Sequence, residues 1–241
     1  MKILIKNRFS REVVLSGEAD SVAAFFHKTV KAGADLTGID LPGINLAGAT
    51  LDGVCLASSN LSGANLTRGD LSGADLTRAN LTRAVLINAL LGKANLTEAN
   101  LTGADLTLAD LRGSSLVNAD LYWSVMTGAN LEGADLSQTN LARSNLTVAN
   151  LANCDFFWAD LGGSNLTMAN LRGAAMTVAN LSKACLVLAD LSAATLAGAD
   201  LSGADLSGAN LENADVSDAN FVGTNLAGVN LSGVDLRKAK R

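Results

Sequence analysis

Apolar residues recur at every fifth position over most of the chain. From Leu36 to Leu236 each fifth residue is apolar, which makes 41 consecutive units without an insertion or a deletion. A small residue, usually alanine, stands two positions before the apolar one, and the position between them is mostly Asp or Asn. The central residue is leucine in all units but five, which carry Met126, Phe156, Met176, Val216 and Phe221.

A five-residue period fits neither a continuous helix nor a continuous strand. On an α-helix, residues five apart differ by a net rotation of about 140°, so the leucines would not share a face. In a short extended piece, the small residue and the leucine point to one side and the Asp or Asn between them points to the other. The last two residues of each unit, often Ser-Gly or Thr-Gly, must then turn the chain, because glycine tolerates turn dihedrals and Asp or Asn can bond to backbone two residues on.

The pattern Ala-(Asp/Asn)-Leu-x-x resembles that of the pentapeptide-repeat protein family. The resemblance covers residues 34–238 and is specific, because all 41 units stay in phase. It implies an all-β solenoid: a right-handed quadrilateral β-helix with four units per coil and with alanine and leucine side chains inside. The units would form about ten coils, a rod of roughly 48 Å at ~4.8 Å per coil. Residues twenty apart in sequence would then stack on one another.

Residues 1–33 lack the repeat and predict an N-terminal cap made of a β-hairpin and a short α-helix. The hairpin strands are expected at Lys2–Lys6 and Val13–Ser16, on either side of a polar turn. The expected N-cap and C-cap positions of the helix are Asp20 or Ser21 and Gly33.

The expected role of this cap is to cover the open end of the solenoid. An open end exposes leucines and unpaired strand edges. Three of the eight Phe and Trp residues lie in this segment, Phe9, Phe25 and Phe26, which suits filling that end. The predicted apolar face of the helix consists of Val22, Phe25, Phe26 and Val30. His27, the only histidine, is expected on the helix surface.

The C-terminus shows no comparable cap in the sequence, because only residues 237–241 follow Leu236. Four of those five residues are Lys or Arg, so residues 239–241 are expected to form a basic tail. Either these cations discourage stacking, or a second copy covers the end. The family resemblance implies an end-to-end homodimer through this end. The residues expected to supply its apolar bulk are Phe221, Val222, Val229 and Val234.

Four units per coil sort the outward residues onto four walls. We name walls A, B, C and D after the first leucine of each, Leu36, Leu41, Leu46 and Leu51. Counting the residue before each leucine and the two after it, the net charge is −5 on wall A, −1 on walls B and C, and −3 on wall D. Wall C has only three charged residues, Arg68, Asp105 and Asp205.

Wall C also carries more large outward apolar residues than any other wall. The apolar strip, as we call it, consists of Val85, Ile87, Leu108, Val125, Val148, Met168, Val187 and Leu188. Core positions are already filled by alanine and leucine, and a contiguous exposed apolar patch usually marks a binding site. The strip is therefore predicted to contact a protein partner. The alternative is that β-favouring residues are merely tolerated on an outer wall.

A second group of outward residues is aromatic, in a chain that is only 4% aromatic. Its members are Tyr122, Trp123, Phe157 and Trp158. Aromatic side chains are enriched at binding hot spots, so these four are candidate contact residues, on the neighbouring walls A and B. The alternative is that they decorate the surface without a partner.

The composition offers little material for catalysis or metal binding. One histidine and three scattered cysteines supply no Ser-His-Asp set and no cysteine cluster. Asp and Asn alternate in the same slot, which indicates backbone hydrogen bonding rather than paired carboxylates. The sequence therefore predicts a non-enzymatic protein without a cofactor or a bound metal.

Targeting signals are also missing from the sequence. The first residues contain no apolar segment of secretory length, and no window approaches the ~18 apolar residues of a membrane span. An odd number of distant cysteines, Cys55, Cys154 and Cys185, does not indicate a disulfide framework. A cytoplasmic protein without a membrane partner is expected.

Two functions remain open from the sequence. The first is a structural rod that binds a protein of unknown identity through its side walls. The second is a DNA mimic that binds DNA gyrase or topoisomerase IV, as the resemblance implies for some family members. A duplex of ~48 Å carries about 28 charges, whereas residues 34–241 carry 20 acidic and 12 basic residues. Mimicry is therefore the less favoured function, and direct nucleic-acid binding is not expected.

Overall fold

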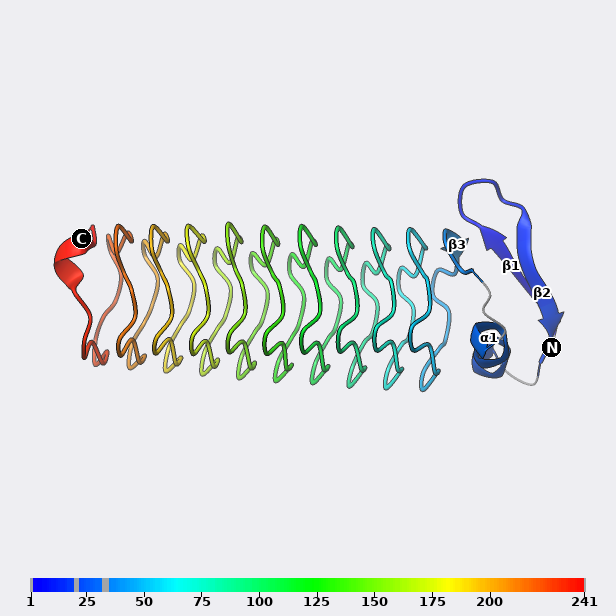
Figure 1. Ribbon diagram of the computed structural model, residues 1–241, viewed down its shortest axis with the longest axis horizontal. Helices are drawn as coiled ribbons and strands as arrows, with labels where there is room; N and C mark the ends of the chain where they lie inside the picture. Colours follow the sequence, from blue (N-terminus) through cyan, green and yellow to red (C-terminus); the bar gives the residue numbers. More distant parts are fainter. Residues whose placement is uncertain (1, 20–21, 32–34, 241) are drawn as a thin grey trace.

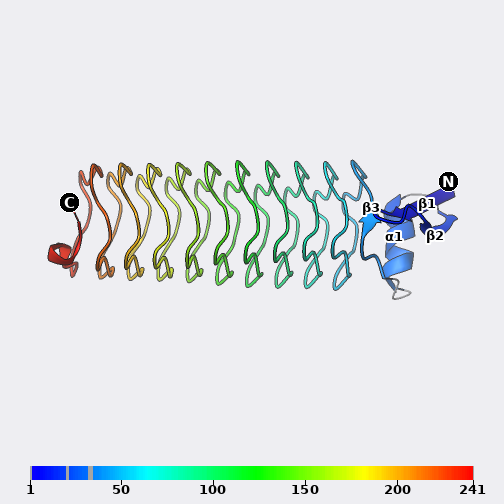
Figure 2. The same cartoon turned by 90° about the horizontal axis from the view of Figure 1, so that it is seen from above.

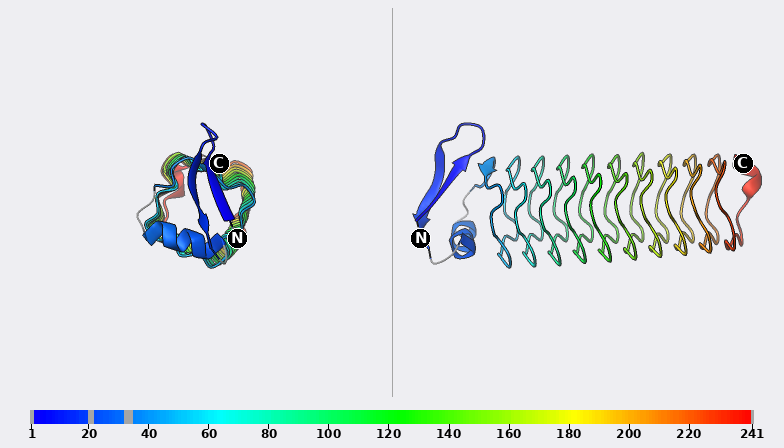
Figure 3. Two further views of the ribbon diagram at one scale, coloured as in Figure 1. Left: turned by 90° about the vertical axis from the view of Figure 1, so that its right-hand side faces the viewer. Right: turned by 180° about the vertical axis from the view of Figure 1, so that it is seen from behind.

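The computed structural model describes residues 2–19, 22–31 and 35–240 of the protein. The repeat region is a straight stack of coils, with a small unit at its N-terminal end and one helical turn at its C-terminal end (Figure 1). A view from above shows the same regular stack (Figure 2). Along the axis, the coils superpose into one four-sided outline (Figure 3).

Neighbouring coils pair through single parallel β-bridges between residues twenty apart. These bridges run from Asp40–Asn60 at the first coil to Asn220–Lys240 at the last. Asn45, Asn65 and Val85 therefore lie above one another on wall C. The stacking of every fourth unit, on which the assignment of walls depends, is confirmed.

In a repeat unit whose slot before the leucine holds Asp or Asn, every backbone N–H has an acceptor, as residues 60–64 illustrate. The N–H groups of Asn60, Leu61 and Gly63 donate to carbonyls of the neighbouring coils at 2.8, 2.7 and 2.8 Å. Ala64 donates to the Leu61 carbonyl across the corner at 3.0 Å. Ser62 donates to the side-chain Oδ1 of Asn60 at 3.2 Å. Where the slot before the leucine holds Asp or Asn, its side chain thus accepts the one N–H of the unit that has no backbone partner.

Each corner is a turn whose second inner residue has positive φ, the signature of a type II turn. Between residues 38 and 233 this position is Gly in 18 corners and another residue in 22, with φ between 52° and 77° throughout. Glycine adopts this conformation without steric penalty, whereas other L-residues are strained by about 1–2 kcal/mol. Each corner residue other than glycine therefore lowers the stability of the rod through backbone strain.

The interior of the rod is a dry column of alanine and leucine. Leucines of the middle coils, such as Leu86, Leu121 and Leu161, have no exposed surface. The substitutes fit the same slot, because Met126, Phe156 and Met176 are also fully buried.

The N-terminal unit contains the predicted hairpin and helix. Strands β1 (Lys2–Asn7) and β2 (Val13–Glu18) pair antiparallel. Strand β1 also pairs antiparallel with β3 (Ile39–Asp40), so the sheet order is β2-β1-β3. Helix α1 (Val22–Lys31) packs beside this sheet at the end of the rod (Figure 3). The hairpin therefore joins the first coil through β3.

Ile5 and Phe26 of this unit are fully or almost fully buried, and Phe25 and Phe26 meet edge to face at 5.8 Å. Beneath them, Leu36 is fully buried and Leu41 is only 7% exposed. The unit thus covers the first coil. Val22 is half-buried and His27 is exposed. The expected helix caps Asp20, Ser21 and Gly33, and the side chain of Val30, lie outside the described residues.

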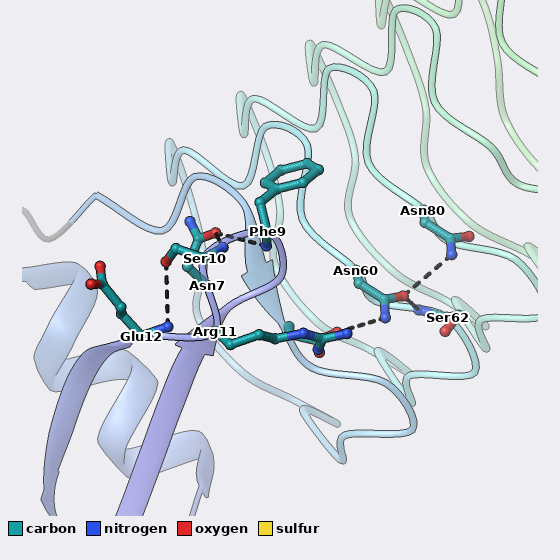
Figure 4. Close-up of polar contacts among 9 residues, drawn as sticks. Asn7, Phe9, Ser10, Arg11, Glu12, Asn60, Ser62 and Asn80 are labelled. Atoms are coloured by element: carbon teal, nitrogen blue, oxygen red, sulfur yellow. Dashed lines mark hydrogen bonds and ion pairs between the residues drawn. The ribbon is translucent and has the colours of Figure 1, made fainter.

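Phe9 does not fill the end of the rod, contrary to the sequence-based expectation. It lies at the tip of the hairpin, is 70% exposed, and has the Arg8 guanidinium 5.1 Å from its ring centroid. The reason is local, because Asn7 Oδ1 accepts the N–H groups of Phe9 and Ser10 and fixes a tight turn away from the core (Figure 4).

The same hairpin tip is tied to wall B of the rod. Arg11 donates to the Asp40 carboxylate at 2.7 Å, and Asn60 Nδ2 of the next coil donates to the same carboxylate at 2.7 Å. Asn80 continues this ladder to Asn60 at 3.3 Å (Figure 4). The cap is thus joined to the repeat by side chains as well as by β3.

The last coil is followed by one 3-10 turn, η1 (Leu236–Lys238). Asp235 caps it by accepting the Arg237 N–H. Lys240 then exchanges backbone hydrogen bonds of 2.8 Å with the preceding coil, so the expected basic tail is bound as a further rung as far as residue 240. The turn does not seal the end: the inward residues Leu226, Leu231, Val234 and Leu236 are only half-buried.

Candidate interaction surface

The apolar strip divides into an exposed and a half-buried part. Val85, Ile87 and Val187 are half-buried on wall C. The other five residues are well exposed, with fractions of 57% for Leu108, 37% for Val125, 51% for Val148, 55% for Met168 and 59% for Leu188. The exposed part is therefore the part that can meet a partner.

Four of these exposed residues occupy the corner between walls C and D, at successive coils interrupted once by a glycine. Leu108, Val148, Met168 and Leu188 have φ between 55° and 57°. A Cβ built on Gly128 would lie 2.8 Å from Leu108 Cδ2, and one built on Gly208 would lie 2.8 Å from Leu188 Cδ2. The two glycines therefore leave room for the side chains of Leu108 and Leu188, which lie over them. The apolar row is continuous because the Leu108 side chain extends over Gly128.

These four residues are unfavourable for the isolated rod on two grounds. Each holds an L-residue in the left-handed region, which is strained by about 1–2 kcal/mol. Each also exposes more than half of an apolar side chain to water. Val148 is the strongest case, because a β-branched residue with positive φ is a genuine outlier. The strain is shared with the other non-glycine corners, so the exposed apolar surface is what distinguishes these four residues.

Trp123 lies on the corner between walls B and C, at the margin of the strip. It is 66% exposed and separates two open hollows. The first has about 440 Å³ and includes Arg83, Thr102 and Gly103 in its lining. The second has about 260 Å³ and is lined in part by Val125 and Arg143. Trp123 therefore connects the strip, through Val125, with two arginines of its own corner.

The four aromatic candidates do not form one cluster. Phe157 and Trp158 lie 6.4 Å apart on wall A and its corner with wall B, exposed by 46% and 66%. Within the described part of the chain no ring contact joins them to Tyr122 or Trp123. Tyr122 is 36% exposed, and its N–H donates to Asp120. The sequence placed these residues on neighbouring walls, and the structure keeps the two pairs apart.

Two exposed apolar residues of the repeat region were not predicted from the sequence. Val178 is 41% exposed and follows Trp158 in the same corner row. Leu90 is 45% exposed and contributes to a hollow of about 590 Å³ on wall D, beside Lys93 and the Asp110–Arg112 ion pair. The exposure of Leu90 could have been predicted from the sequence, because it occupies the outward slot that Asp or Asn fills in other units.

The residues proposed for a dimer end differ in their exposure. Phe221 is only 4% exposed and belongs to the core. Val222 is 53% exposed on the outside, and Val229 and Val234 are half-buried inward residues of the last coil. The apolar surface at this end is therefore supplied chiefly by the open last coil.

The polar columns are engaged in structural hydrogen bonds. On wall B, Asn140 Nδ2 donates to Asp120 Oδ1 at 2.9 Å and Asn180 Nδ2 donates to Asp160 Oδ1 at 2.8 Å. An Asn one coil after an Asp thus offers a neutral donor where a second Asp would repel. The predicted role of Asp and Asn as partners of the backbone is confirmed, as in the bond from the Tyr122 N–H to Asp120, and the side-chain ladder between coils is an addition that the sequence did not predict.

The described residues contain no group of three or more His, Cys, Asp or Glu side chains able to hold a metal ion. Burial raises the pKa of the Cys154 thiol to about 12, and its Sγ lies 3.0 Å from the Leu131 carbonyl. That thiol is protonated at neutral pH and buried, so it is a poor nucleophile. Cys55, Cys154 and Cys185 are all free thiols.

A model of the family of pentapeptide repeats matches the chain in eight copies over residues 32–240. Among solved structures, the chain is similar to HetL, a pentapeptide-repeat protein involved in the regulation of heterocyst differentiation in the cyanobacterium Nostoc sp. strain PCC 7120. The identity is 35%, the TM-score is 0.82, and the match covers 89% of this chain and 94% of HetL.

Two further solved structures are more distant in superposition. Rfr23 from the cyanobacterium Cyanothece 51142 is 38% identical over 40% of this chain and 63% of its own, with a TM-score of 0.32. QnrB1, a plasmid-mediated fluoroquinolone resistance protein, is 22% identical over 81% of this chain and 90% of its own, with a TM-score of 0.29. No curated protein sequence matches the chain.

Proposed function

The chain belongs to the pentapeptide-repeat family of right-handed quadrilateral β-helices, and from this premise we propose that it is a non-enzymatic rod that binds a protein partner through wall C. Proteins of this family are generally non-enzymatic structural repeat proteins. Solenoids offer extended side surfaces for binding. The rod supplies such a surface in the exposed part of the apolar strip.

The observation that carries the proposal is the row Leu108, Val148, Met168 and Leu188. Glycine stands at the same corner position in 18 other turns and would remove both the strain and the exposed apolar surface. Four bulky apolar residues in one row, on the wall with few charges, are explained by a partner that buries them. The likeness to HetL over most of both chains supports a regulatory role exerted by binding.

The test uses paired substitutions that add the same charges at equivalent corners. Leu108→Asp with Leu188→Asp should leave the circular-dichroism spectrum unchanged and remove the partner band from a pull-down in the source cell. The control is Asn118→Asp with Asn153→Asp, because these residues have the same corner conformation on other corners. Equal capture by both variants and the wild type would contradict the proposal.

A second variant separates stability from binding. Val148→Gly relieves a strained corner, so we expect the free energy of unfolding to rise by roughly 0.5–1 kcal/mol. The same change should weaken partner capture, because it removes an exposed apolar group from the middle of the row. Urea unfolding and quantitative pull-down measure the two effects. A variant that is less stable than the wild type would contradict the strain argument.

The alternative function, a DNA mimic that binds gyrase or topoisomerase IV, is less favoured. Asp alternates with neutral Asn up the column of wall B, as in the Asp120–Asn140 and Asp160–Asn180 pairs. The acidic charge is also concentrated on walls A and D. A supercoiling assay with and without a quinolone separates the two functions, and inhibition or protection at micromolar protein would favour mimicry.

Two subsidiary proposals concern assembly and location. The half-buried last coil supports an end-to-end homodimer through the C-terminal end. Three free thiols favour a reducing compartment, and we place the rod in the cytoplasm. No helix among the described residues has the length and apolar character to cross a membrane.

A further inference from the structure

The corner between walls B and C carries cations that the fold itself does not use. Its row of corner residues reads Gly63, Arg83, Gly103, Trp123, Arg143 and Gly163, followed one coil later by Lys183. Arg83, Arg143 and Lys183 are exposed. Of the cations in the described part of the chain, Arg11, Arg78, Arg112 and Arg237 form ion pairs, and none of these pairs includes a cation of this row.

The nearby carboxylate does not neutralise these guanidinium groups by contact. Asp120 Oδ1 accepts the Tyr122 N–H at 3.0 Å and Asn140 Nδ2 at 2.9 Å, and its Oδ2 lies 3.2 Å from Thr102 Oγ1. These are neutral donors of the ladder and of the corner. The two arginines therefore remain available for a ligand, although the protein as a whole carries a net charge of −5.

Glycines of the row leave space between the long side chains. A Cβ built on Gly103 would lie 3.7 Å from Arg83 Cγ and 4.0 Å from Trp123 Cε3, so both side chains border the surface over this glycine. The hollow of about 440 Å³ lies here. Apolar ring surface and a free guanidinium therefore face the same open space.

From this arrangement we propose that the corner between walls B and C binds an extended acidic peptide segment of the partner, of the form acid-x-apolar-x-acid. The proposal rests on the proposed function and specifies the chemistry of the partner. Its two carboxylates pair with Arg83 and Arg143. Its apolar side chain enters the hollow over Gly103 and packs against Trp123.

The spacing follows from the geometry of the coils. Arg83 and Arg143 are three coils apart, which is about 14 Å at ~4.8 Å per coil. An extended chain rises ~3.3 Å per residue, so residues four apart span about 13 Å. Residues i, i+2 and i+4 of an extended segment also point to the same side. Two acids and one apolar residue at these positions can therefore meet the two arginines and the hollow together.

Charge complementarity also fixes where such a segment can lie. Walls A and D carry net charges of −5 and −3 and repel it, whereas the unpaired row attracts it. Electrostatic complementarity of this kind excludes wrong orientations and raises the association rate. An acidic segment is thus directed to the margin of the apolar strip, where Val125 and Trp123 share the second hollow.

The experiment uses the full chain and synthetic peptides. The probe is fluorescein-labelled Gly-Ser-Glu-Ser-Leu-Ser-Glu-Ser-Gly. A second peptide has its second Glu moved one residue toward the first, which turns that carboxylate to the opposite side, and a third has Lys in place of both Glu residues. We expect a saturable rise in anisotropy below about 1 mM for the first peptide alone, and weakening on raising the salt concentration.

Arg83→Glu with Arg143→Glu should weaken binding of the first peptide at least tenfold. The matched control is Arg172→Glu with Lys93→Glu, which reverses two exposed cations on wall D and should change the affinity less than twofold. In a Trp158→Phe background Trp123 is the only tryptophan, and its emission should shift when the first peptide binds. No saturable binding, equal binding of the register-shifted peptide, or an equal loss in the wall D control variant would each overturn the proposal.

The outcome is separable from that of the proposed function. If Leu108→Asp with Leu188→Asp abolishes partner capture while no peptide binds, wall C binds its partner and the acidic-segment proposal is wrong. If the peptide binds as expected while the strip variant captures its partner normally, the partner uses the B–C corner and the assignment to the strip is wrong.

Discussion

The two ends of the rod solve the same problem differently. At the N-terminal end, a three-stranded sheet and helix α1 bury the first leucines, and Leu36 has no exposed surface. At the C-terminal end there is only a single 3-10 turn, and Leu231 and Leu236 stay half-buried. A solenoid coil cannot bury its own outer face, so an end is completed either by a cap or by another surface. Among the described residues, the first coil is covered and the last coil is only half-buried.

The largest expected effect is the loss of the N-terminal cap. Phe26 is fully buried against the end of the rod, so Phe26→Ala should lower the stability of the cap by about 3–5 kcal/mol. The matched change at the other end, Leu231→Ala, removes a half-buried side chain and should lower stability by only about 1–2 kcal/mol. Hydrogen exchange of the first and last coils measures both. Equal losses at the two ends would break the comparison.

A charge placed on the open end tests what covers it. If a second copy binds there, Leu231→Asp should bury an unpaired carboxylate in the interface and weaken dimerisation at least tenfold. Light scattering should show the wild type at twice the mass of the variant. Val178→Asp is the control for charge alone, since Val178 is an exposed apolar residue far from the C-terminal end. A monomeric wild type would show that the end remains open in solution.

The smallest expected effect is a pH dependence at the C-terminal turn. The Arg237 side chain, which donates to Asp235, lowers the pKa of that carboxyl to about 2. A carboxyl whose pKa is depressed by folding stabilises the folded state above its ordinary pKa of 3.8, and this contribution is lost as the pH falls toward 2. The protection of the last backbone amides, measured as the exchange rate relative to the intrinsic rate at the same pH, should therefore fall between pH 4 and pH 2, and Asp235→Asn should remove most of this dependence. Protection that does not change over this range would show that the cap of η1 contributes nothing.

Most of the fold was readable from the sequence because the repeat leaves little freedom. A leucine at every fifth position fixes the corner, and four corners fix the stacking of residues twenty apart. The role of Asp and Asn followed from their interchange in one slot, and hydrogen bonds such as that from Ser62 to Asn60 confirm it. The family itself was also identified from this pattern.

The details of the surface were less predictable, because they depend on side chains one coil away. Exposure of Leu108 depends on Gly128 beneath its side chain, and the hollow beside Trp123 depends on Gly103. The outward position of Phe9 results from a turn fixed by Asn7, and the 3-10 turn of the terminus replaces a regular corner. Periodicity places a residue on a wall but does not say how far its side chain reaches.

Because residues twenty apart stack, the wall on which a residue lies depends on the number of units that precede it. Removal of one whole coil would shorten it and leave every later residue on its own wall. Removal of a single unit would keep the hydrogen-bonded ladder and the dry interior intact, yet it would rotate everything downstream by a quarter turn. A deletion placed after Leu108 would then carry Val148, Met168 and Leu188 to a different corner. Such a molecule would fold normally, but its downstream surface residues would lie on different walls. Only a deletion or an insertion of a multiple of twenty residues preserves the arrangement of the surface.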